Sequence, residues 1–254
     1  MLSTALFCMA ILSPQADPRQ LVLDKDFSVL TDVDESVWRF DDGPVHNNEA
    51  QKYTLKPAKN AWIEDGCLVL EARKKDGVIT SARLQSVAAW KHGKVEVVAK
   101  VPTGKGTWPA IWMLGDSLRQ NSPLNFVPWP KCGEIDIMEN VGFDPFKFYF
   151  TLHSEKFNHM KGTQMTEVVT IPDETPAFHT YTLDWRPGKI EMAMDGKVVF
   201  SREKGAEGED GWPFEAPHYL ILNLAIGGFW GGAKGIDESI FPSRFLIKSV
   251  KVWQ

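Results

Sequence analysis

The sequence has few cysteines and no long hydrophobic run, and each shortage excludes a class of protein. It holds three Cys in 254 residues, without a CxxC pair or a Cys/His cluster, so a zinc site is a poor interpretation. The longest apolar run, from Leu2 to Leu12, is too short to span a membrane. The net charge is −5 and no block of like charges occurs, which argues against nucleic acid and anionic membranes as partners.

The N-terminal apolar run is typical of an export signal. Small residues and Pro14 follow it, and Ala16 is a candidate cleavage site, although no Lys or Arg precedes the run. We expect a signal peptide at 1–16, a single domain at 17–254, and a monomer that is secreted or periplasmic. The alternative is a buried N-terminal segment. Cleavage would leave Cys67 and Cys132, and the sequence leaves open whether they pair.

Short strands separated by turn signals account for most of the chain. Residues 93–100 alternate apolar and polar side chains, as in a strand with one buried face. An Asp-Gly pair at 195–196 lies between two apolar runs and predicts a hairpin. Residues 218–226 are apolar nearly throughout, which favours a central strand covered on both faces. The pattern predicts an all-β sandwich, with Trp62 and Trp185 in its core.

The stretch GEIDIMEN places three carboxylates in a segment otherwise suited to a core. Glu134 and Asp136 share one face of a strand, because side chains alternate with a period of two. A regular strand would turn Glu139 to the opposite face. A β-bulge at Ile137–Met138 would insert one residue and return Glu139 to the acidic face. A helix would separate Glu134 from Glu139 around its circumference.

Three neighbouring acids repel one another, and a structural role rarely needs that arrangement. Glycoside hydrolysis does need it, because one carboxylate acts as nucleophile or base while a protonated carboxyl donates to the leaving oxygen. A nearby acid raises the pKa of its neighbour by like-charge repulsion. The alternatives are a solvent-exposed acidic strand edge and a calcium site.

Glu-Ile-Asp-Ile-Met-Glu resembles the active-site signature of glycoside hydrolase family 16, in its bulged form. The similarity runs from about Leu21 to the C-terminus and is greatest to the laminarinase-like branch, whose substrate is β-1,3-glucan. The segments that carry it, besides the signature, are 47–54, 80–83, 106–114, 129–133, 222–228 and 250–253.

The resemblance implies a jelly-roll sandwich of two antiparallel sheets with a cleft on the concave sheet. It implies an endo-acting hydrolase that retains anomeric configuration, with Glu134 as nucleophile, Glu139 as general acid/base and Asp136 as the assisting carboxylate. Retention requires the two carboxyl groups to lie about 5–5.5 Å apart.

The resemblance also implies a set of substrate-binding residues in the cleft. Each has a structural alternative: a core position for a Trp, a surface position for the Arg, a structural role for the His, and a loop or turn role for an Asn. The set comprises Trp108, Trp112, Arg83, His153, Asn47, Asn223 and Trp230.

The expected substrate is β-1,3-glucan, with mixed-linkage glucan as a side activity. The alternatives are a galactan such as agar, porphyran or carrageenan, and a glucan-binding protein without catalysis. No cofactor is expected. Many members of the family bind a structural calcium through an Asp of the final strand, where this chain has Lys248. An ammonium group has no lone pair to offer a cation, so we predict no calcium there.

Overall fold

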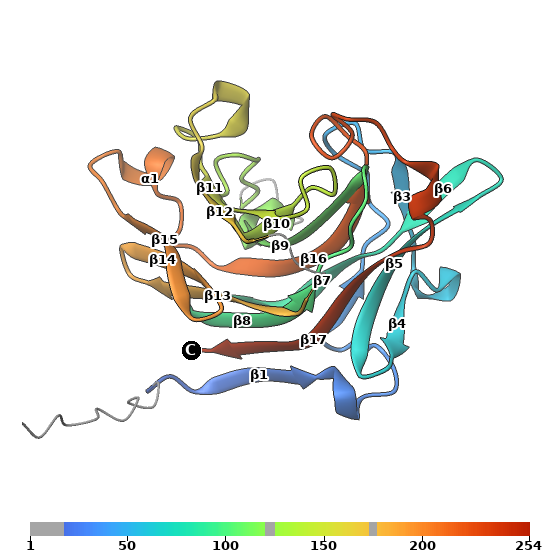
Figure 1. Cartoon of the computed structure of the whole chain (residues 1–254). Helices are drawn as coiled ribbons and strands as arrows, with labels where there is room; N and C mark the ends of the chain where they lie inside the picture. The colour runs from blue at the N-terminus through green and yellow to red at the C-terminus, as the bar shows by residue number, and fades with distance from the viewer. Residues whose placement is uncertain (1–17, 120–124, 173–176) are drawn as a thin grey trace, which may run out of the picture.

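The computed structural model describes residues 18–119, 125–172 and 177–254. The apolar run at 2–12, the cleavage site at Ala16 and Cys8 lie outside the described residues, so the export signal stays a prediction. Two large β-sheets stack face to face and share one hydrophobic core (Figure 1).

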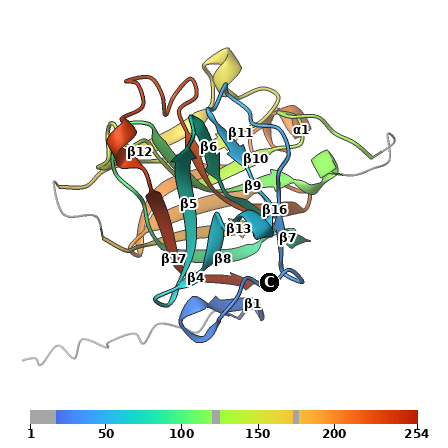
Figure 2. The same ribbon diagram turned by 90° about the vertical axis from the view of Figure 1, so that its right-hand side faces the viewer.

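One sheet has ten strands. They are β1 (Leu21–Asp26), β3 (Gln51–Tyr53), β4 (Ala61–Glu64), β5 (Cys67–Lys75), β6 (Val78–Ser81), β8 (Gly93–Lys100), β13 (His179–Arg186), β14 (Lys189–Met194), β15 (Lys197–Glu203) and β17 (Ser243–Trp253). The order is β15-β14-β13-β8-β17-β5-β6-β3, with β1 beside β17 and β4 beside β5. Strand β1 lies under β17 at the base of the molecule in both views (Figures 1 and 2).

The other sheet has seven strands. They are β2 (Trp38–Phe40), β7 (Arg83–Trp90), β9 (Thr107–Gly115), β10 (Glu134–Asn140), β11 (Lys147–His153), β12 (Met165–Thr170) and β16 (His218–Ile226). The order is β12-β11-β10-β9-β16-β7-β2, and neighbouring strands pair antiparallel. In the ten-stranded sheet β3 and β6 run parallel, which the expectation of two purely antiparallel sheets did not include.

Helical segments are short. They are α1 (Gly208–Gly211) and the 3-10 turns η1 (Phe27–Val29), η2 (Lys56–Ala58), η3 (Asp116–Arg119), η4 (His159–Lys161) and η5 (Glu238–Ile240). Within the described ranges, no helix is both long and apolar enough to cross a membrane.

The predicted alternation produces the core. In β8, Val95, Val97 and Ala99 are buried and the residues between them are partly exposed, so one face packs inward. All nine residues of β16 are buried, as expected for a central strand. It lies between β9 and β7, with one face on the core and the other on the floor of a cleft. The prediction of a β-sandwich is confirmed.

One of the two predicted core tryptophans is in the core. Trp185 is buried and its indole Nε1 donates to the carbonyl of Phe214 at 2.9 Å. The core position predicted for Trp62 is wrong, because this side chain is only half-buried. Strand β4 pairs with β5 alone, and the guanidinium groups of Arg73 and Arg244 cover the Trp62 ring at 5.2 and 5.3 Å. Cation–π contacts replace core packing here.

The two cysteines outside the N-terminal run are both buried and free. Cys67 begins β5 in the ten-stranded sheet, whereas Cys132 precedes β10 in the seven-stranded sheet. The structure therefore shows no disulfide between them.

Candidate active site

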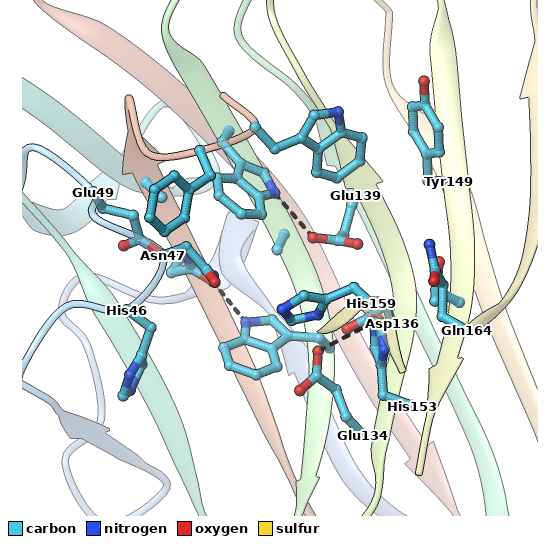
Figure 3. A pocket seen from close by; sticks show the side chains of 18 of the residues that line it. His46, Asn47, Glu49, Glu134, Asp136, Glu139, Tyr149, His153, His159 and Gln164 are labelled. Atoms are coloured by element: carbon cyan, nitrogen blue, oxygen red, sulfur yellow. Dashed lines mark hydrogen bonds and ion pairs between the residues drawn. The ribbon is translucent and has the colours of Figure 1, made fainter. Parts of the chain in front are cut away.

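The bulge predicted from the acid spacing is present in β10. Against β11, Asp136 pairs with Thr151 and Glu139 with Tyr149, so two residues of β10, Ile137 and Met138, face one on β11, and the strand carries one extra residue. The register against β9 also shifts between Asp136 and Met138. Glu139 therefore returns to the face that carries Glu134 and Asp136, and all three line one cleft (Figure 3). The prediction of a bulge is confirmed.

The cleft lies on the outer face of the seven-stranded sheet and has a volume of about 470 Å³. Alternation along β9 turns Trp108 and Trp112 into it, while Ile111 and Met113 point into the core. The same alternation selects His153 on β11, since Leu152 before it is a core residue. Each strand thus gives one face to the core and the other to the cleft.

Glu134 receives a hydrogen bond from a residue outside the sheet. The indole Nε1 of Trp129 donates to Glu134 Oε2 at 2.6 Å, and His153 Nε2 lies 3.8 Å from Glu134 Oε1. The Glu134 side chain keeps 16% exposure, so one side of the carboxylate remains open to the cleft.

Asp136 is the most enclosed of the three acids, at 2% exposure. Its Oδ2 lies 3.4 Å from His153 Nε2, and this oxygen has no hydrogen-bond partner among the described residues. A hydrogen bond between the Asp136 and Glu134 carboxyls lowers the Asp136 pKa against the effect of burial. Trp112 is its neighbour across the β9–β10 pairing. Asp136 therefore sits on the cleft floor between an imidazole and an indole.

Glu139 has its own indole donor. Nε1 of Trp108 donates to Glu139 Oε1 at 2.9 Å. The Trp108 ring packs edge-on against Trp230, with centroids 5.4 Å apart, and Trp230 packs edge-on against Tyr149 at 4.7 Å. Glu139 therefore faces an aromatic wall made by three different segments.

Burial and mutual repulsion perturb all three acids. Desolvation raises the pKa of Glu134 well above its ordinary value, and the Asp136 charge adds to the rise. Desolvation and the Glu139 charge raise the pKa of Asp136 well above its ordinary value. Desolvation also raises the pKa of Glu139, against the Trp108 hydrogen bond, which lowers it. The site therefore holds at least one carboxyl protonated at a pH where free carboxyls are ionised.

A chain of hydrogen bonds through Asn223 and Tyr53 positions Trp112. Its Nε1 donates to Asn223 Oδ1 at 2.7 Å, and Asn223 Nδ2 donates to the hydroxyl of Tyr53 at 3.0 Å. The Tyr53 hydroxyl in turn donates to Glu49 Oε2 at 3.4 Å. The Arg83 guanidinium lies 4.5 Å over the Tyr53 ring.

An ion pair with Asp41 positions Arg83. Its Nε donates to Asp41 Oδ2 at 2.7 Å, and its side chain is 8% exposed. The ion pair keeps the guanidinium flat against the cleft wall, so a surface position for Arg83 is wrong.

Two loops close one side of the cleft. Asn47 and Asn48 adopt left-handed backbone angles, with φ of 53° and 59°, which Asn tolerates better than most residues. The Phe229 amide donates to the Asn47 carbonyl at 2.8 Å, so the loop carrying Trp230 docks on this turn. A Cβ on Gly228 would come within 3.0 Å of the same carbonyl, so the close approach needs glycine there.

All ten residues named from the sequence line this one cleft, and their individual roles stay predictions. The prediction missed further lining residues. Glu49, Tyr53, Ala110 and Ala225 fall in the similar segments, so a signal existed for these four. Trp129, which donates to Glu134, begins the segment leading into the signature and had a signal too. The others, His46, Tyr149, Thr151, His159, Gln164, Thr166 and Phe229, carry no local signal.

A metal ion could be held at one place among the described residues. Glu134, Asp136 and His153 each offer one ligand atom, and these atoms lie within 4.8 Å of one another. At the position considered for calcium, Lys248 Nζ lies 4.1 Å over the ring of Phe178. The absence of calcium there stays a prediction.

A two-sheet sandwich with three carboxylates on a bulged strand, inside an aromatic-lined cleft, defines a glycoside hydrolase type of site. The model of the glycosyl hydrolases family 16 matches residues 34–240. A beta-glucanase of Rhodothermus marinus is 36% identical over 100% of this chain and 93% of its own length. A glucan endo-1,3-beta-glucosidase of Cryptopygus antarcticus is 37% identical over 82% of each chain. The chain belongs to glycosyl hydrolase family 16.

A solved structure agrees over nearly the whole molecule. SCLam, described as a non-specific endo-beta-1,3(4)-glucanase of the same family, matches with a TM-score of 0.84 at 37% identity. The match covers 95% of this chain and 94% of the other. The jelly-roll architecture expected from the resemblance is confirmed.

Proposed function

We propose that this protein is an endo-acting, retaining glycoside hydrolase that cleaves β-1,3-glucan of the laminarin type. One observation carries the proposal: the bulge in β10 brings Glu139 back to the face of Glu134, and each carboxylate has its own indole donor. Two carboxyls in one open cleft, held by different partners, have the differing environments that an acid and a nucleophile need.

Glu134 acts as nucleophile and Glu139 as acid/base. A Glu134 oxygen bonds to the anomeric carbon as the bond to the leaving sugar breaks, and the Glu139 proton goes to the leaving oxygen. The Glu139 carboxylate then takes a proton from water, which attacks the same carbon and releases Glu134. Burial raises the pKa of Glu139, which keeps the first proton in place.

Asp136 adjusts the charge of its neighbours. Burial raises the pKa of both Asp136 and Glu134 well above their ordinary values, and the Trp129 hydrogen bond favours the ionised form of Glu134. In this proposal Asp136 therefore holds the proton while Glu134 is ionised. A neutral Asp136 lets the cleft carry one negative charge at Glu134 instead of two at close range. The Trp129 indole stabilises that charge from the other side.

The aromatic walls and the relatives' names support a β-glucan substrate. Indole rings of Trp108, Trp112 and Trp230 line the cleft and offer faces and edges to the apolar sides of sugar rings. Two of the relatives named above, the Cryptopygus antarcticus enzyme and SCLam, act on β-1,3-glucan or on β-1,3(4)-glucan by their names. We therefore include mixed-linkage glucan as a side activity.

The two alternatives are less well supported. A sulfated galactan calls for several cationic side chains, whereas Arg83 is the one Arg or Lys among the described cleft residues and is paired with Asp41. A binding protein without catalysis does not need the three acids, which are present and together.

Reducing-sugar release from laminarin, lichenan and agarose tests the function. We expect short oligomers from laminarin, slower release from lichenan, and none from agarose. Glu134→Gln should lower kcat on laminarin by at least about 10³-fold while its melting curve stays cooperative. Glu96→Gln, on the opposite sheet, is the matched control and should keep full activity. Laminarin that is bound but not cleaved by wild type would contradict the proposal.

A further inference from the structure

Three cleft atoms approach the geometry of a metal site. His153 Nε2 lies 3.4 Å from Asp136 Oδ2 and 3.8 Å from Glu134 Oε1, and the set fits within 4.8 Å. In a tetrahedral zinc site with bonds of about 2.0–2.2 Å, ligand atoms stand about 3.3–3.6 Å apart. Side-chain adjustments of a few tenths of an ångström to about one ångström would bring the three atoms onto one ion.

A second observation points to a ligand at the same place. Asp136 Oδ2 is buried, belongs to a residue 2% exposed, and has no hydrogen-bond partner among the described residues. Buried acceptors are normally satisfied, and an unsatisfied one is costly. A cation between Asp136, Glu134 and His153 would displace the proton that Asp136 holds and satisfy this oxygen (Figure 3).

We propose that the substrate-free cleft binds one divalent cation of the zinc class through Glu134, Asp136 and His153, and that this cation competes with glucan. Glu134 is 16% exposed toward the cleft, so the ion would keep an open coordination position on the substrate side. Binding needs only this geometry, whereas inhibition rests on the proposed function, since the ion occupies the Glu134 carboxylate.

The donor set selects the cation. One imidazole nitrogen and two carboxylate oxygens suit Zn²⁺ and Cu²⁺, and affinity should fall from Cu²⁺ and Zn²⁺ to Co²⁺. Ca²⁺ takes six to eight oxygen ligands and Mg²⁺ an octahedral set, so a three-ligand site with one nitrogen suits neither. His159, whose ring centroid lies 5.3 Å from that of His153, is outside the three-ligand set.

Calorimetric titration of the purified protein with ZnCl₂, without substrate and in a non-chelating buffer at neutral pH, tests the binding. We expect one saturable site per chain, and none for CaCl₂ or MgCl₂. His153→Gln should weaken zinc binding by at least roughly tenfold. Glu134→Gln, at a partly exposed position, should also weaken zinc binding. This variant replaces His153→Gln in the test if His153→Gln does not fold. His179→Gln, which removes a partly buried His of the opposite sheet paired with Asp195 at 2.7 Å, should leave affinity unchanged.

Laminarin hydrolysis then tests the competition. Zinc should raise the apparent KM without changing kcat, and EDTA should reverse the effect. No stoichiometric zinc binding by wild type, or equal affinity in both cleft variants, would overturn the site. Zinc that binds at the site but leaves KM unchanged would overturn the competition. If laminarin is not cleaved at all, the proposed function fails while the calorimetric result on the metal site still stands.

Discussion

The indole of Trp129 donates to the carboxylate of Glu134 at 2.6 Å, Nε1 to Oε2, from the loop that leads into β10. An N–H donor favours the ionised form of a carboxylate and so opposes the burial and the Asp136 charge that raise the Glu134 pKa. The four residues between Trp129 and Glu134 form the turn that brings a donor onto the proposed nucleophile.

Trp129→Phe should therefore weaken catalysis through Glu134. The ring is kept but the donor is lost, so the pKa of Glu134 should rise and the acid limb of the kcat/KM profile should move to higher pH. A hydrogen bond to a charged group is worth about 1.5–3 kcal/mol, so kcat should fall roughly 10–100-fold. A pH–rate profile of the variant on laminarin gives both quantities. An unmoved acid limb would show that this bond does not set the Glu134 charge.

Trp108→Phe should act on the alkaline limb of the kcat/KM profile. Nε1 of Trp108 stabilises the ionised form of Glu139, and its loss should raise the pKa of this carboxyl further. The acid/base residue would then stay protonated to higher pH, and the alkaline limb of kcat/KM should move upward. The absolute rate should fall as well, because the ring lines the cleft. An alkaline limb that moves downward would contradict the assignment of Glu139 as acid.

Asp136→Asn should stabilise the protein at neutral pH while reducing its activity. The folded state binds the Asp136 proton more tightly than the unfolded state, because burial and Glu139 raise this pKa. Stability therefore falls as pH rises from the unfolded pKa of about 3.9 through the folded one. Asn cannot ionise, so the variant avoids this loss of stability at neutral pH. Its Tm there should rise by roughly 2–4 °C for each kcal/mol of stability regained, and near pH 4 the Tm should change little. Melting curves at both pH values check this; an equal shift at both would refute the charge explanation.

Tyr53→Phe should weaken the hydrogen-bond network that positions Trp112 while leaving the three carboxylates of β10 unchanged. The variant keeps the ring under Arg83 but removes the hydroxyl that accepts from Asn223 and donates to Glu49. Asn223 then loses one of the contacts that hold it against the Trp112 indole. We expect a several-fold rise in KM for laminarin with kcat changed less, and Tm lowered by the loss of one or two buried hydrogen bonds of about 1 kcal/mol each. Tyr149→Phe, whose ring packs on Trp230, is a matched control for loss of a cleft hydroxyl.

Calcium should not stabilise this protein. Lys248 stands where the resemblance to the family leads us to expect a calcium-binding carboxylate, and its ammonium lies over the Phe178 ring. An ammonium repels a cation and offers no lone pair. Tm measured with millimolar CaCl₂ and with EDTA should be the same. A rise with calcium that EDTA abolishes would contradict this prediction.

The acid cluster was predictable because its geometry is local. Alternation places Glu134 and Asp136 together, and the three-residue step to Glu139 requires the bulge that the structure contains. The partners of these acids were not predictable in the same way. Trp108 meets Glu139 across 31 residues and Trp112 meets Asn223 across 111, and such pairs depend on strand register between distant segments.

The sequence by itself determined the sandwich, the acidic face of one strand and the family, because hydrophobic period and short motifs are properties of neighbouring residues. Tertiary structure alone decided which side chains surround each acid. It put His153 beside Asp136, stacked Arg83 on Tyr53 and left Trp62 outside the core between two arginines. The physical reason is that pairing and burial, which set charge and hydrogen bonding at the site, arise only when distant strands pack together.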